Sequence, residues 1–283
     1  MRTLLGSLLV LLAVPVFLQA QSKTSREQLG LLGPVHNIRI ELEVPAEAGS
    51  TAARVLLHIN VFDEKGNSIQ QTTYNRDGSL AAKFWWKHVY DAQGRVVKTS
   101  WYNAKGILTY SYVSVYDEKG LRTETTFINP KGSTTSHVQL FYDEYGRKIS
   151  EAHRQTTGAA DDVRLTYDAN GQVTSEMFSQ GPGFFRHEVF TYDERGRPTG
   201  GTTFKADGTP VQMYKWSHTY DDRGNMKEKI SYAPDGSVSS RETFTYEFDE
   251  RGNWIKRITS RELFKEGRPQ NETEVTYRTI TYF

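Results

Sequence analysis

The chain lacks cysteine and lacks an excess of either charge, and each absence restricts what it can be. Without cysteine, its 283 residues have no disulfide framework and no cysteine nucleophile, so burial and backbone pairing must stabilise the fold. Lysine and arginine number 35 against 34 aspartate and glutamate, a net charge of +1 with no basic or acidic block. This balance lacks the electrostatic footprint of a nucleic-acid-binding protein, so we expect no nucleic-acid partner.

Long apolar runs are absent except at the N-terminus. Arg2 precedes an apolar run from Leu4 to Leu18, and Gln19-Ala20 then leads into polar residues, which is the order of a secretory signal. The run is about 15 residues long and Pro15 interrupts it, whereas a spanning helix needs roughly 20. We expect residues 1–20 to be a signal peptide cleaved after Ala20, with no transmembrane helix afterwards. The chain would then be exported to the periplasm, the cell surface or the medium.

Aromatic residues make up 12% of a chain whose mean hydropathy is −0.62. Tyrosine, phenylalanine and tryptophan must therefore supply much of the buried surface, and this favours β-structure over helices.

A repeated motif, aromatic-Asp-x-x-Gly, organises the sequence from Phe62 to Gly252. It occurs eight times, at successive steps of 28, 26, 26, 25, 25, 28 and 28 residues. A looser turn lies between most copies, as in Tyr102-Asn103-Ala104-Lys105-Gly106. Each unit therefore reads as strand, turn, strand, turn.

The residues of the motif predict its geometry. Aspartate can hydrogen-bond the backbone two residues on, and glycine supplies the positive φ of a type I turn followed by a G1 bulge. We assign structural turn roles to the following residues: Tyr90, Asp91, Gly94, Tyr116, Asp117, Gly120, Tyr142, Asp143, Gly146, Tyr167, Asp168, Gly171, Tyr192, Asp193, Gly196, Tyr220, Asp221 and Gly224.

The alternation of apolar and polar residues before these turns predicts one aromatic-rich face and one polar, solvent-exposed face of the sheet. The first face carries the motif aromatic and residues at even offsets from it, namely Trp86, His88 and Tyr90; Tyr112, Ser114 and Tyr116; Val163, Leu165 and Tyr167; Trp216, His218 and Tyr220; and Phe244, Tyr246 and Phe248. Roughly 18 strands spaced about 4.8 Å apart would form a ribbon near 85 Å long, which must coil. We predict an all-β antiparallel hairpin array, coiled into an open shell or solenoid-like sheet with the aromatic face on its concave side.

The ends of the array have their own expectations. Residues 21–53 form a lead-in with a capping strand over Val35 to Val44, and residues 54–283 form the repeat domain. The segment Arg268-Pro269-Gln270-Asn271 is predicted to turn the chain into a last strand from Glu274 to Phe283. The second turns at Thr156 to Asp161 and at Ser179 to Gly183 are degenerate and predict irregularity.

The motif continues with arginine in several copies, as in Tyr90-Asp91-Ala92-Gln93-Gly94-Arg95, Tyr142-Asp143-Glu144-Tyr145-Gly146-Arg147 and Tyr192-Asp193-Glu194-Arg195-Gly196-Arg197. This pattern resembles the YD repeats of Rhs-like proteins over about residues 54–283. The resemblance implies an exported β-sheet scaffold, because large members form a spiralling β-shell around a toxic cargo and eukaryotic relatives act in cell adhesion. This chain ends within the array and has no Asp-Pro dipeptide, so it is most similar to short stand-alone exported members.

The sequence offers no recognised catalytic or metal constellation. It lacks a Gly-x-Ser-x-Gly elbow, a P-loop and a dinucleotide fingerprint, and its seven histidines show no close metal-ligand spacing. The pairs Asp161-Asp162 and Asp221-Asp222 fall in predicted turns, where solvated carboxylates explain them better than glycoside hydrolysis does. We expect no enzyme activity, no metal and no cofactor.

Aromatic clusters are the candidate contact surface. We single out Trp85, Trp101 and Tyr110 as ligand-contact residues, for a glycan or a protein hot spot, against the alternative that they fill the interior. Because Trp86 shares the face of Tyr90, Trp85 is predicted to point the opposite way, which makes Trp85 the better exposed-contact candidate of the three.

Three functions stay open: a binding scaffold for protein or glycan, a structural envelope component that pairs through sheet edges, and a hydrolase with an unrecognised site. An outer-membrane barrel is a fourth alternative, but charges such as Lys87, Arg164 and Glu247 on one face and Glu188 on the other interrupt any lipid-facing band.

Overall fold

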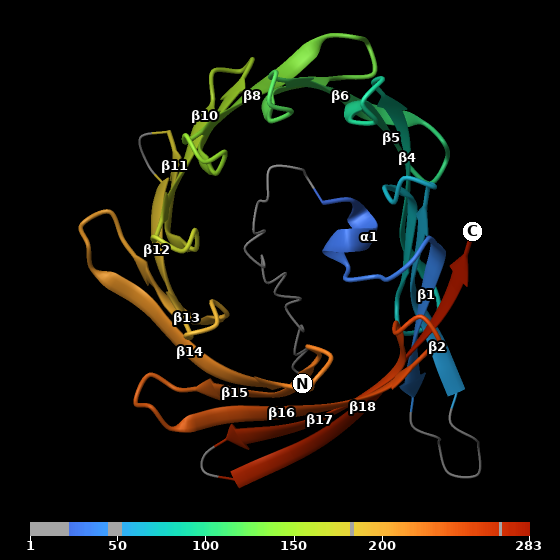
Figure 1. Ribbon diagram of the computed structural model, residues 1–283, viewed down its shortest axis with the longest axis vertical. Coiled ribbons are helices and arrows are strands. Elements are labelled where there is room, and N and C mark those ends of the chain that lie inside the picture. Colours follow the sequence, from blue (N-terminus) through green and yellow to red (C-terminus); the bar gives the residue numbers. More distant parts are fainter. Residues whose placement is uncertain (1–22, 45–52, 182–183, 266–267) are drawn as a thin grey trace, which may run out of the picture.

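Eighteen antiparallel strands and one short helix make up the computed structural model of the protein, which describes residues 23–44, 53–181, 184–265 and 268–283 (Figure 1). The elements are α1 (Ser25–Gln28), β1 (Val35–Val44), β2 (Ala53–Phe62), β3 (Ser68–Tyr74), β4 (Leu80–Tyr90), β5 (Val96–Tyr102), β6 (Leu108–Tyr116), β7 (Arg122–Ile128), β8 (Thr134–Tyr142), β9 (Lys148–Gln155), β10 (Ala160–Tyr167), β11 (Val173–Gln180), β12 (Phe184–Tyr192), β13 (Pro198–Phe204), β14 (Pro210–Tyr220), β15 (Met226–Tyr232), β16 (Val238–Phe248), β17 (Trp254–Lys265) and β18 (Arg268–Tyr282). Within the described ranges, no helix is long and apolar enough to cross a membrane.

The sheet closes into a barrel, and the predicted open shell is therefore wrong. Each strand pairs with the next along the chain, and β18 pairs in turn with β1, with Ile38 opposite Ile280 and Leu42 opposite Thr276. The coiling that an 18-stranded sheet requires brings its two terminal strands into register with each other. Figure 1 shows the resulting ring from its end. Closure leaves no free sheet edge among the strands that the structure describes, because both sides of each are paired.

The predicted turn geometry is confirmed at the motif turns, of which the one between β4 and β5 is typical. Oδ1 of Asp91 accepts hydrogen bonds from the backbone N–H groups of Gln93 at 3.0 Å and Arg95 at 2.8 Å. Gly94 has φ of 80°, which a residue with a Cβ adopts only with strain. The register shifts by one residue between Val89 and Tyr90, as a bulge requires.

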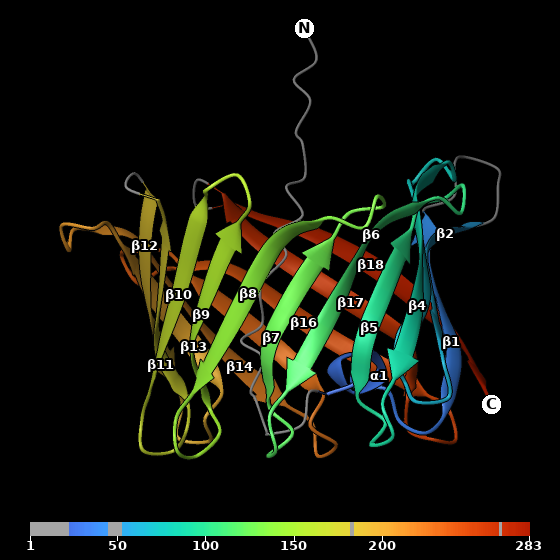
Figure 2. The same ribbon diagram turned by 90° about the horizontal axis from the view of Figure 1, so that it is seen from above.

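All the motif turns lie at one end of the barrel, together with α1; we call this the turn end (Figure 2). The looser turns lie at the other end. Two predictions made there need correction: residues Arg268 to Asn271 belong to strand β18 rather than to a turn, and Asp161 and Asp162 belong to β10. The predicted turn at Ser179 to Gly183 is shorter, because Ser179 and Gln180 end β11.

The lead-in contains a helix that the sequence reading missed, and it anchors the barrel seam. Thr24 and Glu27 form a capping box at the start of α1. The backbone N–H of Arg26 donates to the carbonyl oxygen of Gly66 at 3.0 Å, and its guanidinium donates to that of Val35 at 3.1 Å. The expected signal peptide, residues 1–20, lies outside the described residues, as does most of the loop before Arg54.

A buried hydrophobic cluster lies at this seam. Leu31, Val35, Ile38 and Phe62 pack together, and Phe62 and Val35 are fully buried. This cluster joins the lead-in to β1 and β2, so the expected capping strand serves as the closing strand of the barrel.

Candidate functional site on the inner wall

Side-chain direction on the barrel wall follows from the lead-in. The segment with α1 lies inside the ring in Figure 1, and Leu31 just after the helix packs against Phe62. Phe62 therefore faces inward. Because side chains alternate along each strand and paired residues share a face, the strand registers assign the motif aromatics and their even offsets to the inner wall. The predicted aromatic-rich concave face is thus the inner wall.

Tyrosines at the turn end link each repeat to the one before it. The hydroxyl of each donates to a backbone carbonyl at the start of the strand after the previous motif turn: Tyr116 to Val96 at 2.9 Å, Tyr142 to Arg122 at 2.7 Å, Tyr167 to Lys148 at 2.5 Å and Tyr192 to Val173 at 2.6 Å. Burial raises the pKa of all four tyrosines, so they stay protonated donors. Each of these hydroxyls therefore ties its own repeat to the preceding one.

Arginines strengthen the same links. The Arg95 guanidinium pairs with Asp91 at 2.6 Å and lies over the ring of Tyr116, 4.7 Å from its centroid. Arg197 repeats the arrangement with Asp193 and Tyr220. The arginine that follows the motif glycine therefore joins its own turn to the next aromatic.

An aromatic stripe runs across the inner wall from β4 to β7, and we define it by its members: Phe84, Trp86, Trp101, Tyr110, Tyr112 and Phe127. Ring centroids are 4.9 Å apart for Trp86 and Trp101, and 5.1 Å apart for Trp101 and Tyr110, whose rings are stacked. Phe84 is 39% exposed, and the Trp and Tyr members are partly exposed. The stripe is therefore a continuous aromatic surface that is partly exposed.

The three predicted contact residues are divided between the two walls. Trp101 and Tyr110 lie together in the aromatic stripe, whereas Trp85 lies on the outer wall, as its alternation predicts. There its indole N–H donates to Oε1 of Gln70 at 2.9 Å, and Lys83 lies 4.7 Å from its ring centroid. Trp85 is therefore part of a polar outer surface and not of the stripe.

A small pocket continues the stripe on β7 to β9, with a volume of about 160 Å³. Tyr112 and Phe127 of the stripe line it, together with Arg122, Thr125, Val138, Leu140, Glu151 and His153. Val138 and Leu140 are buried and form an apolar floor. We call this the stripe pocket.

Charged groups converge at the stripe pocket. His153 Nε2 lies 3.1 Å from Oε2 of Glu151, and Lys148 bonds the other carboxylate oxygen. Burial raises the pKa of Glu151, but the hydrogen bond and charge of Lys148, with His153, outweigh it and hold that pKa below its usual range. Glu151 is therefore an ionised acceptor beside the Arg122 donor. The sequence analysis singled out neither residue, although Glu151 and His153 share the alternating pattern of an inward-facing pair.

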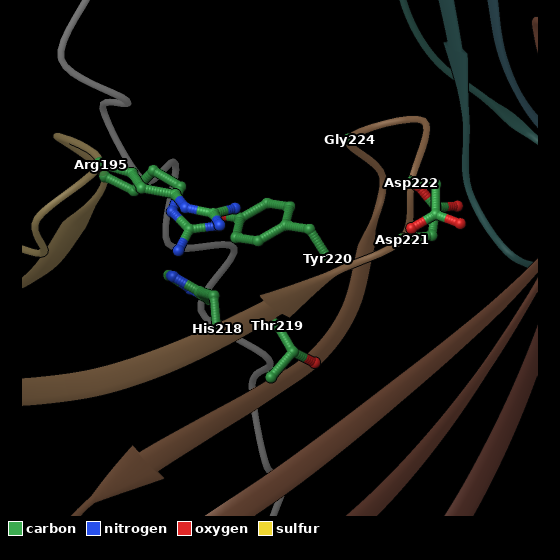
Figure 3. Close-up of a pocket in the computed structure, with 8 residues that line it drawn as sticks. Arg195, His218, Thr219, Tyr220, Asp221, Asp222 and Gly224 are labelled. Carbon is green, nitrogen blue, oxygen red and sulfur yellow. The ribbon is translucent and has the colours of Figure 1, made fainter.

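A larger pocket of about 630 Å³ lies at the turn end near β14. Its lining includes the Tyr220 ring, whose centroid lies 4.4 Å from the guanidinium carbon of Arg197. Figure 3 shows the His218 imidazole on the same side as this ring, whereas Thr219 points away. Burial lowers the pKa of His218, and the nearby charges of Lys229 and Arg197 lower it further. The imidazole is therefore neutral at physiological pH. Asp221 and Asp222 lie in the adjoining motif turn, as expected for solvated turn carboxylates.

No group of three or more histidine, aspartate or glutamate side chains gathers as metal ligands among residues that the structure describes. The carboxylates expected to form turn pairs also separate: Asp161 faces inward opposite His153, and Asp162 faces outward, where Arg154 pairs with it at 2.8 Å. The inner wall thus presents aromatic surfaces and scattered polar groups.

No family model matches the chain, and no curated protein matches its sequence. Solved structures to which the chain is similar include a porin-like protein from Bacteroides uniformis, with 13% identity and a TM-score of 0.43 over 88% of this chain and 99% of that chain. Two others are the complexes TcdB2-TccC3-Cdc42 and TcdB2-TccC3-TEV, at 10% and 12% identity and a TM-score of 0.19; this chain spans 18% and 19% of theirs. At these identities and TM-scores the likeness supports no function for this chain.

Proposed function

We propose that the protein is an exported, non-catalytic binding scaffold that holds a glycan on its inner wall. The aromatic stripe supports this proposal most strongly, because six ring side chains form one surface that ends in a pocket with an ionised carboxylate and a guanidinium. Aromatic faces pack against the apolar faces of sugar rings, and the polar groups of the pocket can bond their hydroxyls. A barrel of 16 to 18 strands is also too wide for its own side chains to fill.

The charged side chains of the outer wall support a location in an aqueous compartment of the cell envelope rather than within a bilayer. By register, most strands place a charged side chain on this wall, for example Lys87, Lys98, Arg164, Lys215, Arg241 and Lys256. Each lysine or arginine costs about 2–4 kcal/mol at the midplane of a bilayer. Several pair with outward carboxylates, as Lys256 does with Glu247 at 2.7 Å.

This location has its own test. We expect the mature chain, residues 21–283, to purify from the periplasmic or extracellular fraction as a monodisperse species without detergent. Recovery only from detergent-solubilised membranes would contradict the location.

The structural alternative, in which copies associate through free sheet edges, loses its basis because a closed barrel has no such edges. We further propose that the chain is a member of the YD-repeat family, on the strength of its shared turn geometry. A profile of its eight motif turns should retrieve YD-repeat chains, and retrieval of unrelated hairpin proteins alone would refute the assignment.

Glycan binding is tested by calorimetric titration of the mature chain with a panel of envelope oligosaccharides. Trp101→Ala removes the centre of the stripe. Trp85→Ala is the matched control, because it removes an indole from the outer wall at the position next to Trp86 on β4. We expect Trp101→Ala to weaken binding at least tenfold, as for a central aromatic contact, and Trp85→Ala to leave it unchanged. Circular dichroism confirms that each variant is folded.

Two outcomes would refute the proposal. One is the absence of saturable binding across the panel. The other is a loss of binding in Trp85→Ala that Trp101→Ala does not share, because the ligand would then lie on the outer wall.

A further inference from the structure

Two arginines on the inner wall lie outside the aromatic stripe and both pockets. Arg257 of β17 is paired with Tyr246, and Arg278 of β18 is paired with Ile40, so both share the inward face of the motif aromatics. Both side chains are partly buried.

The two guanidinium groups share one aromatic ring. The guanidinium carbon of Arg278 lies 3.4 Å from the centroid of Trp254, and that of Arg257 lies 5.2 Å from the same centroid. Contact with the indole face stabilises a cation, but two like charges beside one ring repel each other. Burial and the charge of Arg257 accordingly lower the pKa of Arg278 to about 9.

Neither arginine has an acceptor among the residues that the structure describes. Each Nε–H is buried without a hydrogen-bond partner, and no described carboxylate forms an ion pair with either group. Other inner-wall arginines differ: Arg186 pairs with Glu176 at 3.1 Å, and Arg261 pairs with Glu242 at 2.7 Å. Buried donors without acceptors, and buried like charges without a counter-charge, both cost free energy.

A third unpaired group lies close by in the sequence. The hydroxyl of Thr259 is buried without a partner, and Thr259 lies two residues beyond Arg257 on the same face of β17. Three donor side chains without acceptors therefore gather on the inner wall of β17 and β18.

We propose that Arg257 and Arg278, seated on Trp254, form a binding site for an oxyanion group, either a carboxylate or a phosphate. The planar guanidinium fork matches both groups, and one bound oxyanion would supply the missing acceptors and offset the repulsion. The site is on different strands from the aromatic stripe, so it stands independently of the glycan proposal.

The test is a thermal-unfolding titration of the mature chain with sodium phosphate and with sodium acetate, each against sodium chloride at equal ionic strength. We expect phosphate, acetate or both to raise the melting temperature saturably beyond chloride. The anion with the lower half-saturating concentration identifies the ligand as phosphorylated or carboxylated.

Variants locate the site. Arg257→Gln and Arg278→Gln should each raise the half-saturating concentration at least tenfold. In chloride alone both should melt no lower than the unmodified chain, because each removes one of two repelling charges. Arg186→Gln, an inner-wall arginine that has a carboxylate partner, is the matched control and should keep the anion response.

Three results would overturn the site. They are an equal anion response in all three variants, a response to phosphate and acetate no larger than to chloride, and a melting temperature in chloride that Arg278→Gln lowers. Calorimetric titration of the unmodified chain with phosphate and acetate decides the question without any variant, since absence of saturable heat for both anions refutes the proposal.

Discussion

Replacing Phe62 with alanine tests the seam where the barrel closes. Phe62 ends β2, has no exposed surface, and packs against Leu31 of the lead-in and against Val35 and Ile38 of β1. Its removal leaves a cavity between three segments that have little freedom to move together, because β1 is paired on both sides.

The expected cost follows from this burial. A fully buried Phe→Ala change costs about 3–5 kcal/mol, and a domain of this size loses about 2–4 °C of melting temperature per kcal/mol, so the shift is roughly 6–20 °C. Phe141→Ala is the matched control, because Phe141 faces outward from β8 and is 47% exposed. We expect it to cost under about 1.5 kcal/mol.

The assay is urea unfolding at 25 °C, followed by tryptophan fluorescence, with thermal melts of the same three proteins. If Phe62→Ala costs no more than Phe141→Ala, Leu31 and β1 do not pack against Phe62, and the inward direction assigned to the motif aromatics loses its main support.

Three further predictions concern the turns and the lead-in. Gly224 has φ of 82°, and a Cβ added there meets no atom within 4 Å, so Gly224→Ala adds only backbone strain. It should lower the free energy of unfolding in urea by about 1–2 kcal/mol. An unchanged free energy of unfolding would contradict the positive φ of this turn. The hydrogen bond from Arg197 lowers the pKa of Asp193 in the folded protein, so Asp193 stabilises the fold above the pKa of an unfolded aspartate, about 4, and this stabilisation is lost as the pH falls below it. Asp193→Asn should therefore reduce the loss of stability in acid, measured by urea unfolding across pH, and an unchanged pH profile would refute the contribution. The buried Asn253 side chain accepts a hydrogen bond from the Leu32 N–H at 2.7 Å and donates one to the Leu32 carbonyl oxygen at 2.9 Å. Asn253→Ala should therefore lower the free energy of unfolding by about 1–3 kcal/mol, more than Asn225→Ala at the same position of the preceding motif turn. Equal costs would contradict the docking of the lead-in.

Local features of this fold could be predicted from the sequence. The turns are encoded by residues within a few positions of each other, as Asp91 and Gly94 are, and alternation assigns Trp85 and Trp86 to opposite walls. The estimate of roughly 18 strands also matches the eighteen that the structure describes, because most strands lie between two recognisable turns.

Closure could not be predicted, because it depends on a pairing between residues as far apart as Asn37 and Thr281. The accumulated twist and coil of all the intervening strands decides whether the ends meet, and no local pattern carries that sum. The short helix left a signal that was missed: Thr24 and Glu27 have the spacing of a capping box.

The candidate site also has parts that the sequence predicts and parts that it does not. The aromatic clusters of the sequence single out Trp101 and Tyr110, but alternation favours Trp85 as the contact residue, and Trp85 lies on the outer wall. The stripe pocket could not be predicted, because Arg122, Glu151 and His153 come from successive strands whose register and bulges bring them together. The arginine pair was missed because its distinctive property is the absence of an acceptor, which sequence does not reveal.

The most direct test of the closed barrel uses its lack of native cysteine. Asn37 Nδ2 donates to Oγ1 of Thr281 at 2.6 Å across the seam between β1 and β18 on the outer wall. The double variant Asn37→Cys, Thr281→Cys should form an intramolecular disulfide on mild oxidation, detected by mass spectrometry, whereas Asn37→Cys with Thr191→Cys on β12 should not. If both pairs stay reduced or form only intermolecular links, the seam is open and the division into inner and outer walls is wrong.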